Sequence, residues 1–181
     1  TWSTAYVDNS QVVVVKKNSG ITKLSDLAGK NVIVQSDSSA LAAFTGEDAD
    51  EENIRLAASF KSLQQVGDYN SAFLNLDAGS ADAVCMDIGV AKYEVESRGD
   101  TFTILNEHVS SEEYGVGFKK GNTQLRNQVQ ETLEEMLADG SFDSIVQKWG
   151  LEESACLGQP GTDSVMKAED TVKEKTGFLD N

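Results

Sequence analysis

The chain has 181 residues, of which 39% are hydrophobic and 25% charged, and its 15 basic and 30 acidic side chains leave a net charge of −15. This length suffices for one domain or two small lobes with a hydrophobic core, and the composition is too apolar for intrinsic disorder. So acidic a surface repels phosphate backbones and anionic lipid headgroups, which argues against binding to nucleic acids or to membrane surfaces.

Membrane-spanning and signal segments are not visible in the sequence as given. No apolar run approaches the roughly 18 residues of a membrane-spanning helix, and no charged-then-apolar signal segment opens the chain. The chain starts at Thr1 rather than Met, which indicates a processed or engineered chain. We therefore expect the sequence to be a fragment.

Strands and helices are predicted to alternate from residue 11 onward. Residues 11–15 are a short β-branched run, apolar on both faces, which is typical of a buried strand. One helical turn is predicted within residues 21–30, and residues 31–35 form a second strand. The serine-rich turn 36–39 then predicts an N-capped helix start.

The middle of the chain continues the alternation after an acidic loop at residues 46–53. This loop resembles half a calcium-binding loop but lacks its central glycine and closing glutamate, so we expect no calcium site. The elements predicted beyond it are a helix at 69–76, a strand at 81–87, a helix at 88–96, and strands at 101–105 and 114–118. These elements predict an α/β domain with a mainly parallel sheet.

The C-terminal third reads as helical. Apolar stripes at helical spacing run through residues 125–137 and 142–149. The pattern fades from residue 152, and for the tail to residue 181 we expect a short helix or disorder.

Two cysteines and one histidine limit the chemistry. Cys85 lies in an apolar strand and Cys156 near the tail, without metal-ligand spacing or a CxxC motif. A buried thiol with a surface thiol fits this arrangement, and so does a disulfide. His108 has no catalytic or metal-binding neighbour in sequence, so we expect neither a metal site nor an enzyme.

Two strand ends are candidates for ligand binding. The strand ending at Gln35 leads into Ser38 and Ser39 at a helix start, where free N–H groups and the helix dipole suit an anion. The strand ending Met86-Asp87 offers a carboxylate suited to an ammonium group. Ligands of open α/β sheets gather beyond the carboxyl ends of strands. Together the two ends match a zwitterion.

Simpler roles are open for each of these residues. Ser39 and Asp87 both precede predicted helices and could serve only as N-caps. Gln35 and Met86 could be ordinary strand-end residues. Residue pattern alone does not choose between these readings.

The order of the segments resembles the polar-amino-acid-binding proteins of ABC importers, which have the type 2 periplasmic-binding fold. The matching strings are Trp2-Ser3-Thr4-Ala5-Tyr6, Gln11–Lys17, Leu24–Gln35, Leu76–Val84 with the trailing Asp87, Tyr114–Asn122 and Lys148-Trp149-Gly150. No single string is specific, but the collinear series covers residues 1–151. The resemblance implies an extracytoplasmic protein, periplasmic or a cell-surface lipoprotein with its signal peptide removed, that has an ABC permease as partner.

In that family two lobes close on the ligand, and the resemblance implies a domain assignment. Residues 20–112 would form the complete lobe 2, residues 1–19 and 113–151 a partial lobe 1, and residues 152–181 a C-terminal tail. The N-terminal part of lobe 1 would be missing. We expect its exposed strands to allow self-association with another copy.

The resemblance also implies roles for single residues. Ser39, with Ser38, would contact the ligand α-carboxylate and Asp87 the α-ammonium group. Gln35 and Met86 match positions that face the ligand side chain, and Tyr6 would lie near the hinge.

Two departures from the family pattern bear on affinity. Asp37 stands where the family usually has glycine and adds a negative charge near the carboxylate site. The arginine that clamps the α-carboxylate in the family lies in the missing segment. We therefore expect weak or absent ligand binding by this chain alone.

Two other functions share the fold. The alternative is a ligand-sensing domain of a receptor or sensor kinase, which the lack of a visible transmembrane or signalling segment disfavours. A dehydratase-type enzyme would need a tuned acid–base group in the cleft, and the sequence offers none. A binding protein without cofactor is the interpretation that fits best.

Overall fold

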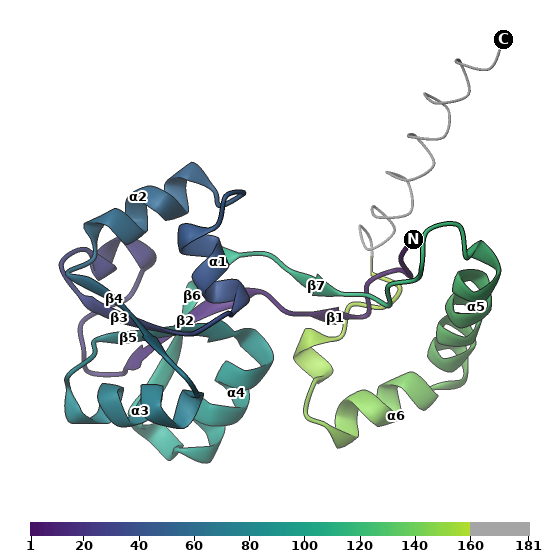
Figure 1. The fold of residues 1–181 in the computed structure, drawn as a ribbon. Coiled ribbons are helices and arrows are strands. Elements are labelled where there is room, and N and C mark those ends of the chain that lie inside the picture. The colour runs from purple at the N-terminus through teal and green to yellow at the C-terminus, as the bar shows by residue number, and fades with distance from the viewer. Residues whose placement is uncertain (160–181) are drawn as a thin grey trace, which may run out of the picture. The chain divides into compact units, whose positions relative to one another are not determined.

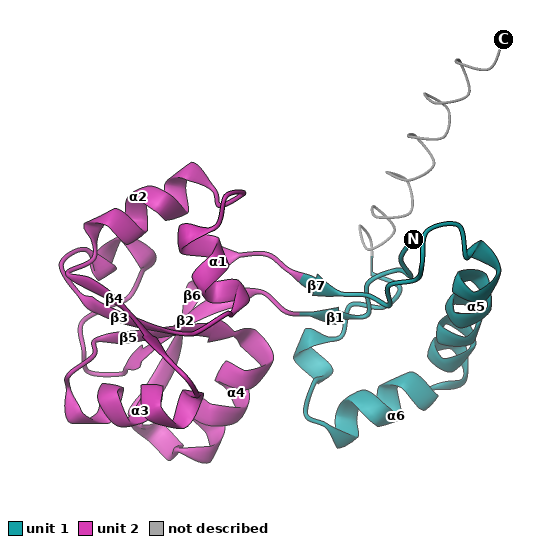
Figure 2. Ribbon diagram, viewed as in Figure 1, with its two compact units in different colours: residues 1–8, 113–181 teal, residues 9–112 magenta. Residues whose placement is uncertain are grey.

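The computed structural model describes residues 1–159, which belong to two compact units coloured separately in Figure 2. Unit 2 is the continuous segment Asn9–Glu112. Unit 1 combines Thr1–Asp8 with the chain from Glu113 onward. Each unit has its own hydrophobic core and is described by itself.

A five-stranded sheet forms the centre of unit 2, in the order β4-β3-β5-β2-β6. Its strands are β2 (Gln11–Lys16), β3 (Asn31–Gln35), β4 (Ser62–Val66), β5 (Ala83–Asp87) and β6 (Phe102–Ser110). Strand β3 pairs in parallel with β4 and β5, whereas β2 is antiparallel to β5 and β6. Only β2 opposes the common direction, so the predicted α/β class with a mainly parallel sheet is confirmed.

Helices cover both faces of this sheet (Figure 1). The helices are α1 (Ser39–Thr45), α2 (Glu51–Ser59), α3 (Tyr69–Ala78) and α4 (Ile88–Ser97), with short 3-10 turns at Leu24–Leu27 and Gly99–Thr101. Helices α1 and α2 lie on one face and α3 and α4 on the other. Helix α3 ends at Gly79, which adopts a left-handed backbone with φ of 74° that favours glycine.

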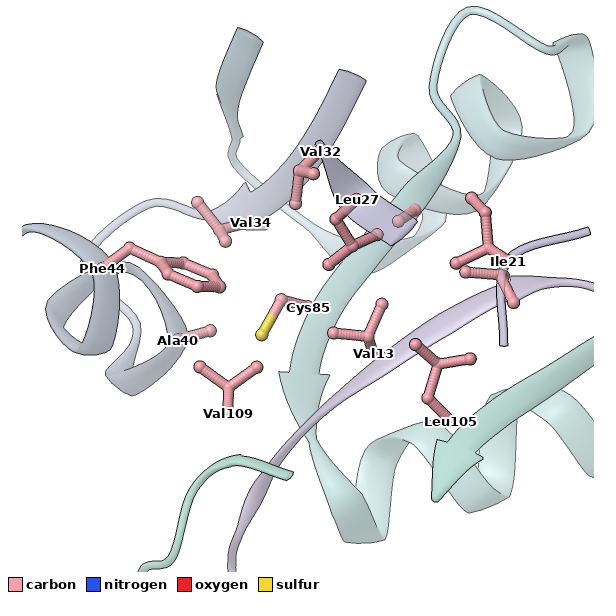
Figure 3. Close-up of a cluster of buried hydrophobic side chains, with 12 residues drawn as sticks. Val13, Ile21, Leu27, Val32, Val34, Ala40, Phe44, Cys85, Leu105 and Val109 are labelled. Atoms are coloured by element: carbon pink, nitrogen blue, oxygen red, sulfur yellow. The ribbon is translucent and has the colours of Figure 1, made fainter. Parts of the chain in front are cut away.

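The core under α1 is apolar and holds one of the two cysteines. Figure 3 shows the Cys85 side chain among those of Ala40, Val13 and Val109, which come from three different elements. The opposite face buries Phe73 of α3 edge-to-face against Phe102, with ring centroids 5.2 Å apart. The two cores pack on opposite faces of β3 and β5 and hold these strands in the sheet. The carboxyl ends of the two strands therefore lie side by side.

In its described residues, 1–8 and 113–159, unit 1 has two short strands and two helices. Strands β1 (Val7–Asp8) and β7 (Glu113–Tyr114) pair antiparallel, and α5 (Thr123–Asp139) precedes α6 (Ser141–Lys148) and a 3-10 turn at Glu152–Ser154. Phe142, Val146 and Leu157 form its small core, against which Tyr6 packs.

The structure differs from the predicted elements at a few places. Helix α2 begins within the predicted acidic loop, and neither α2 nor β4 was predicted. Strand β2 lies inside the sheet of unit 2, although the domain prediction placed residues 1–19 with the partial lobe 1. The predicted strand at 114–118 is reduced to β7 and an isolated bridge at Gly117. The expectation for the tail falls largely on residues 160–181, which lie outside the described residues.

Candidate functional site

The candidate site lies at the edge of unit 2 where β3 and β5 end. The two strands are parallel neighbours, so Gln35 at the end of β3 and Asp87 at the end of β5 reach the same edge of the sheet. Beyond these ends the chain enters α1 and α4.

Ser38, and not Ser39, is the N-cap of α1. The Ser38 hydroxyl accepts a hydrogen bond from the backbone N–H of Leu41 at 3.1 Å and donates to the Gln35 carbonyl at 2.7 Å. The exposed Ser39 hydroxyl donates instead to Glu112 Oε1 at 3.2 Å. The capping role considered for Ser39 therefore belongs to its neighbour, and the Ser39 hydroxyl faces another partner.

Asp87 occupies the N-cap position of α4, but its side chain makes no capping hydrogen bond. Its Oδ1 atom accepts from Gln11 Nε2 at 2.7 Å and from Asn9 Nδ2 at 3.1 Å. The carboxylate is thus held by two amides across the β2–β5 pair and does not cap the helix.

Glu112 connects the two strand ends. Its Oε2 atom accepts from the same two amides, Gln11 Nε2 at 3.1 Å and Asn9 Nδ2 at 3.2 Å. Its other oxygen accepts from Ser39. A continuous hydrogen-bonded chain therefore runs from Ser39 through Glu112 and the amides to Asp87. The two predicted ends of the site share one rim, although α1 and α4 cover opposite faces.

Gln11 is the buried centre of this arrangement, with 1% of its surface exposed. Its Nε2 also donates to the Asn9 carbonyl at 3.1 Å, so three acceptors surround one amide nitrogen. Its Oε1 atom is buried and has no hydrogen-bond partner among residues 1–159. A buried unsatisfied acceptor costs about 1–3 kcal/mol. The amide keeps this orientation because the reverse one would turn its oxygen toward acceptors.

The other predicted contact residues take different positions. Gln35 Nε2 donates to the Gly67 carbonyl at 3.2 Å, at the same sheet edge. Met86 is fully buried in the core beneath α3 and α4, so it has no surface at this edge. Tyr6 belongs to unit 1 and packs in that unit's core. Asp37 is exposed in the turn before Ser38, with φ of 56°.

A hollow of about 410 Å³ adjoins Ser39 and Glu112 within unit 2. Its lining residues are Ser39, Ala42, Ala43, Gly46, Glu47, Asp48, Ala49, Asp50, Asn53, Ser110, Ser111 and Glu112. Four of these are carboxylates and none is Lys, Arg or His, so the hollow is strongly acidic.

Both cysteines are free thiols, so the disulfide alternative is wrong. Burial, followed by the negative charge of Asp87, raises the pKa of Cys85 well above its ordinary value. Partial burial, then Glu113 and Asp8, raises the pKa of Cys156 to about 11. In the described part of the chain no group of His, Cys, Asp and Glu side chains is arranged to hold a metal ion, and no helix has the length and hydropathy to cross a membrane.

Sequence reasoning missed Asn9, Gln11 and Glu112 as members of the site. Asn9 and Gln11 are about a hundred positions from Glu112 in the sequence, and no motif joins them. The one available signal was Gln11 itself, a polar residue directly before a run of four valines.

Comparison with protein families matches residues 1–152 to a family described as bacterial extracellular solute-binding proteins, family 3. The ABC transporter glutamine-binding protein GlnH of Bacillus subtilis is 28% identical over 155 residues, 85% of this chain and 53% of that protein. The L-cystine-binding protein TcyJ of Escherichia coli K12 is 29% identical over 150 residues, 82% of this chain and 53% of that protein. The chain thus spans about half the length of these curated relatives.

Solved structures show the same relationship. An ABC uptake transporter substrate-binding protein from Streptococcus pneumoniae, crystallised with bound histidine, matches with a TM-score of 0.71 and 31% identity. The match covers 86% of this chain and 63% of that one. An ancestral arginine-binding protein bound to arginine matches with a TM-score of 0.64 and 34% identity over 82% of this chain and 63% of its own.

Proposed function

Because the chain belongs to the bacterial extracellular solute-binding proteins of family 3, we propose that it is the part of such a protein that grips a polar amino acid for an ABC importer. The observation that carries this proposal is the placement of Ser39 and Asp87 on one rim of unit 2. A zwitterion needs an anion site and a cation site at close range, and these two strand ends supply them.

The anionic end of the ligand is assigned to the start of α1. Backbone N–H groups in the first turn and the positive end of the helix dipole favour a carboxylate there. The exposed Ser39 hydroxyl adds a donor, and Ser38 fixes the turn by capping the helix. An incoming carboxylate would take the Ser39 hydroxyl from Glu112.

The cationic end is assigned to Asp87. Asn9 and Gln11 both donate to its Oδ1 atom. None of the hydrogen bonds described for Asp87 involves its Oδ2 atom. An ammonium group bound to a positioned carboxylate forms a charge-assisted hydrogen bond, about twice as strong as a neutral one. Gln35, at the same edge, is proposed to contact the ligand side chain. The residues at this sheet edge give no support to the expected ligand contacts of Met86 and Tyr6.

A binding role for transport implies a location and a partner. Members of the family act outside the cytoplasm and are not enzymes, so we propose an extracytoplasmic, non-catalytic protein that delivers its ligand to a membrane permease. The lobe assignment from the sequence, residues 20–112 against 1–19 and 113–151, remains part of this proposal, except that β2, within residues 1–19, belongs to the sheet of unit 2.

Self-association is proposed through the short strands of unit 1. Strand β1 pairs antiparallel with β7 over Val7–Asp8 and Glu113–Tyr114 and forms a single bridge from Val7 to Ala155. A short two-stranded sheet of this kind can be extended by a strand from a second copy. Light scattering that shows a monomer at high concentration would contradict this part of the proposal.

The function is tested by titrating the isotope-labelled chain with each of the twenty amino acids and following backbone NMR signals, which detect weak binding. We expect saturable shifts confined to residues near the ends of β3 and β5. Because Ser39 and Asp87 share one rim of unit 2, we expect weak binding rather than none. If no amino acid shifts any of these signals at the highest soluble concentration, the proposed function fails for this chain.

A further inference from the structure

The candidate site holds two carboxylates, although a single α-ammonium group needs only one. Asp87 Oδ1 and Glu112 Oε2 each lie within 3.2 Å of the same two amide nitrogens, those of Asn9 and Gln11. Both carboxylates are therefore fixed side by side in unit 2.

The hydrogen-bond partners of these two carboxylates carry no positive charge that would neutralise them. Asn9 and Gln11 are neutral amides, and Ser39 contributes a neutral hydroxyl. Asn9 and Gln11 are 5% and 1% exposed, so the donors that hold the pair are themselves almost fully buried. Gln11 keeps its amide turned toward the pair even though its Oε1 is left buried without a hydrogen-bond partner in the described part of the chain. The cost of that orphaned oxygen argues that the double-carboxylate arrangement is a specific feature of the site.

The surroundings add charge of the same sign. Glu112 lies between the amides and the acidic hollow, whose lining contains Glu47, Asp48 and Asp50 but no basic residue. Once the ligand's ammonium group has neutralised Asp87, the charge of Glu112 still acts on the rest of the ligand. In a site that stays well solvated, one unit of charge about 4 Å away changes an affinity by about fivefold, and the effect is larger where water is excluded.

We infer that Glu112 gives this site a preference for amino acids with a positively charged side chain over neutral and anionic ones. The inference rests on the proposed function, since it concerns the ligand bound at Ser39 and Asp87. It assigns to Glu112 the role of a specificity-determining residue and to Asn9 and Gln11 that of positioning residues.

The test compares arginine with citrulline, which has nearly the same shape but no side-chain charge, and glutamate with glutamine. Binding to the chain is measured by NMR titration. We expect arginine to bind about fivefold to tenfold more tightly than citrulline, and this ratio to fall as salt screens the charges. Glu112→Gln keeps an acceptor for the amides and should bring the arginine-to-citrulline ratio to within about twofold of one, while glutamate gains relative to glutamine.

Glu113→Gln is the matched control, because it removes the same charge from the adjacent exposed residue of unit 1. The control should leave both ratios as in the wild type. Citrulline binding as tightly as arginine, or equal effects of the two variants, would overturn the inference while the proposed function stands. Absence of binding by every amino acid would instead contradict the proposed function, and the inference with it.

Discussion

Gln11 and Asp87 are direct partners across the antiparallel pair β2–β5, and Gln11 Nε2 donates to Asp87 Oδ1 at 2.7 Å. The strand register thus delivers a buried amide to the one acidic side chain at the end of β5. Because the apolar run after Gln11 is locked into the core, the amide has little freedom to leave this position. The carboxylate is held in place before any ligand arrives.

Gln11→Met should lower the stability of the chain. Methionine fills a similar volume, but it removes donors from the half-buried Asp87 and Glu112 carboxylates, which should reduce the free energy of unfolding by about 1–3 kcal/mol. Urea unfolding measures the change. Gln65→Met on the exposed face of β4 is the control and should shift the midpoint little. A Gln11→Met variant as stable as the wild type would show that the Gln11 amide makes no net contribution to the free energy of unfolding.

Asp87→Asn should remove most amino-acid binding. The substitution keeps the shape but deletes the charge assigned to the ligand ammonium group, and a charge-assisted hydrogen bond of about 1.5–3 kcal/mol corresponds to a loss of affinity from about tenfold to somewhat more than a hundredfold. The α4 helix should remain intact, because Asp87 makes no capping bond. Asp77→Asn, an exposed carboxylate at the end of α3, serves as the control in the same titration. Undiminished binding by Asp87→Asn would refute the ammonium assignment.

Substitutions at Asp37 should separate backbone strain from charge. With φ of 56°, this residue lies in the left-handed region, which glycine and aspartate tolerate and β-branched residues do not. Asp37→Gly should keep the stability within about 1 kcal/mol and retain or improve ligand binding, because a negative charge leaves the anion site. Asp37→Val should destabilise by about 1–2 kcal/mol. Thermal melts and ligand titration of both variants provide the measurements, and equal stability of the two would argue against the left-handed turn.

Alkaline pH should destabilise the chain through its thiols. Burial raises the folded-state pKa of Cys85, and that of Cys156 is raised to about 11, whereas an unfolded thiol titrates near about 8.5. The contribution of the two protonated thiols to the free energy of unfolding is therefore fully present below about pH 8.5. It is lost as the pH rises toward the folded-state pKa values. Urea unfolding at pH 7.5 and pH 10 should show the decline, and Cys85→Ala should make it smaller. An unchanged pH dependence in Cys85→Ala would contradict the burial of this thiol.

The elements with a strong apolar pattern could be predicted from the sequence, and the polar ones could not. The valine run of β2 and the serine-capped start of α1 were both predicted. Helix α2 was missed because its one fully buried residue is the polar Asn53, and Leu56 and Ala57, which pack against the core, are only partly buried and give too short an apolar pattern to signal a helix. Strand β4 reads SLQQV at the edge of the sheet, where polar side chains face solvent.

The residues of the candidate site also fall into some that could be predicted from the sequence and some that could not. Ser39 and Asp87 could be found because each follows a predicted strand at a helix start. Asn9, Gln11 and Glu112 could not, because only the register of β2 against β5 and the approach of Glu112 bring them together. Met86 was expected to face a ligand, but in the structure its position in β5 points it into the core. Which side of a strand end faces the rim depends on the register, which the residue pattern did not give.

The central claim is that the start of α1 and the carboxylate of Asp87 hold opposite ends of one ligand. It is tested most directly by NMR titration of the labelled chain with arginine, with its analogue that lacks the α-ammonium group, and with its analogue that lacks the α-carboxylate. We predict that arginine shifts the backbone amides of Ser39 and Ala40 and those of Asp87 and Ile88 along a single saturation curve, and that each analogue binds more weakly and loses the shifts at one end. Shifts confined to one end with arginine itself, or equal binding of all three compounds, would contradict the claim.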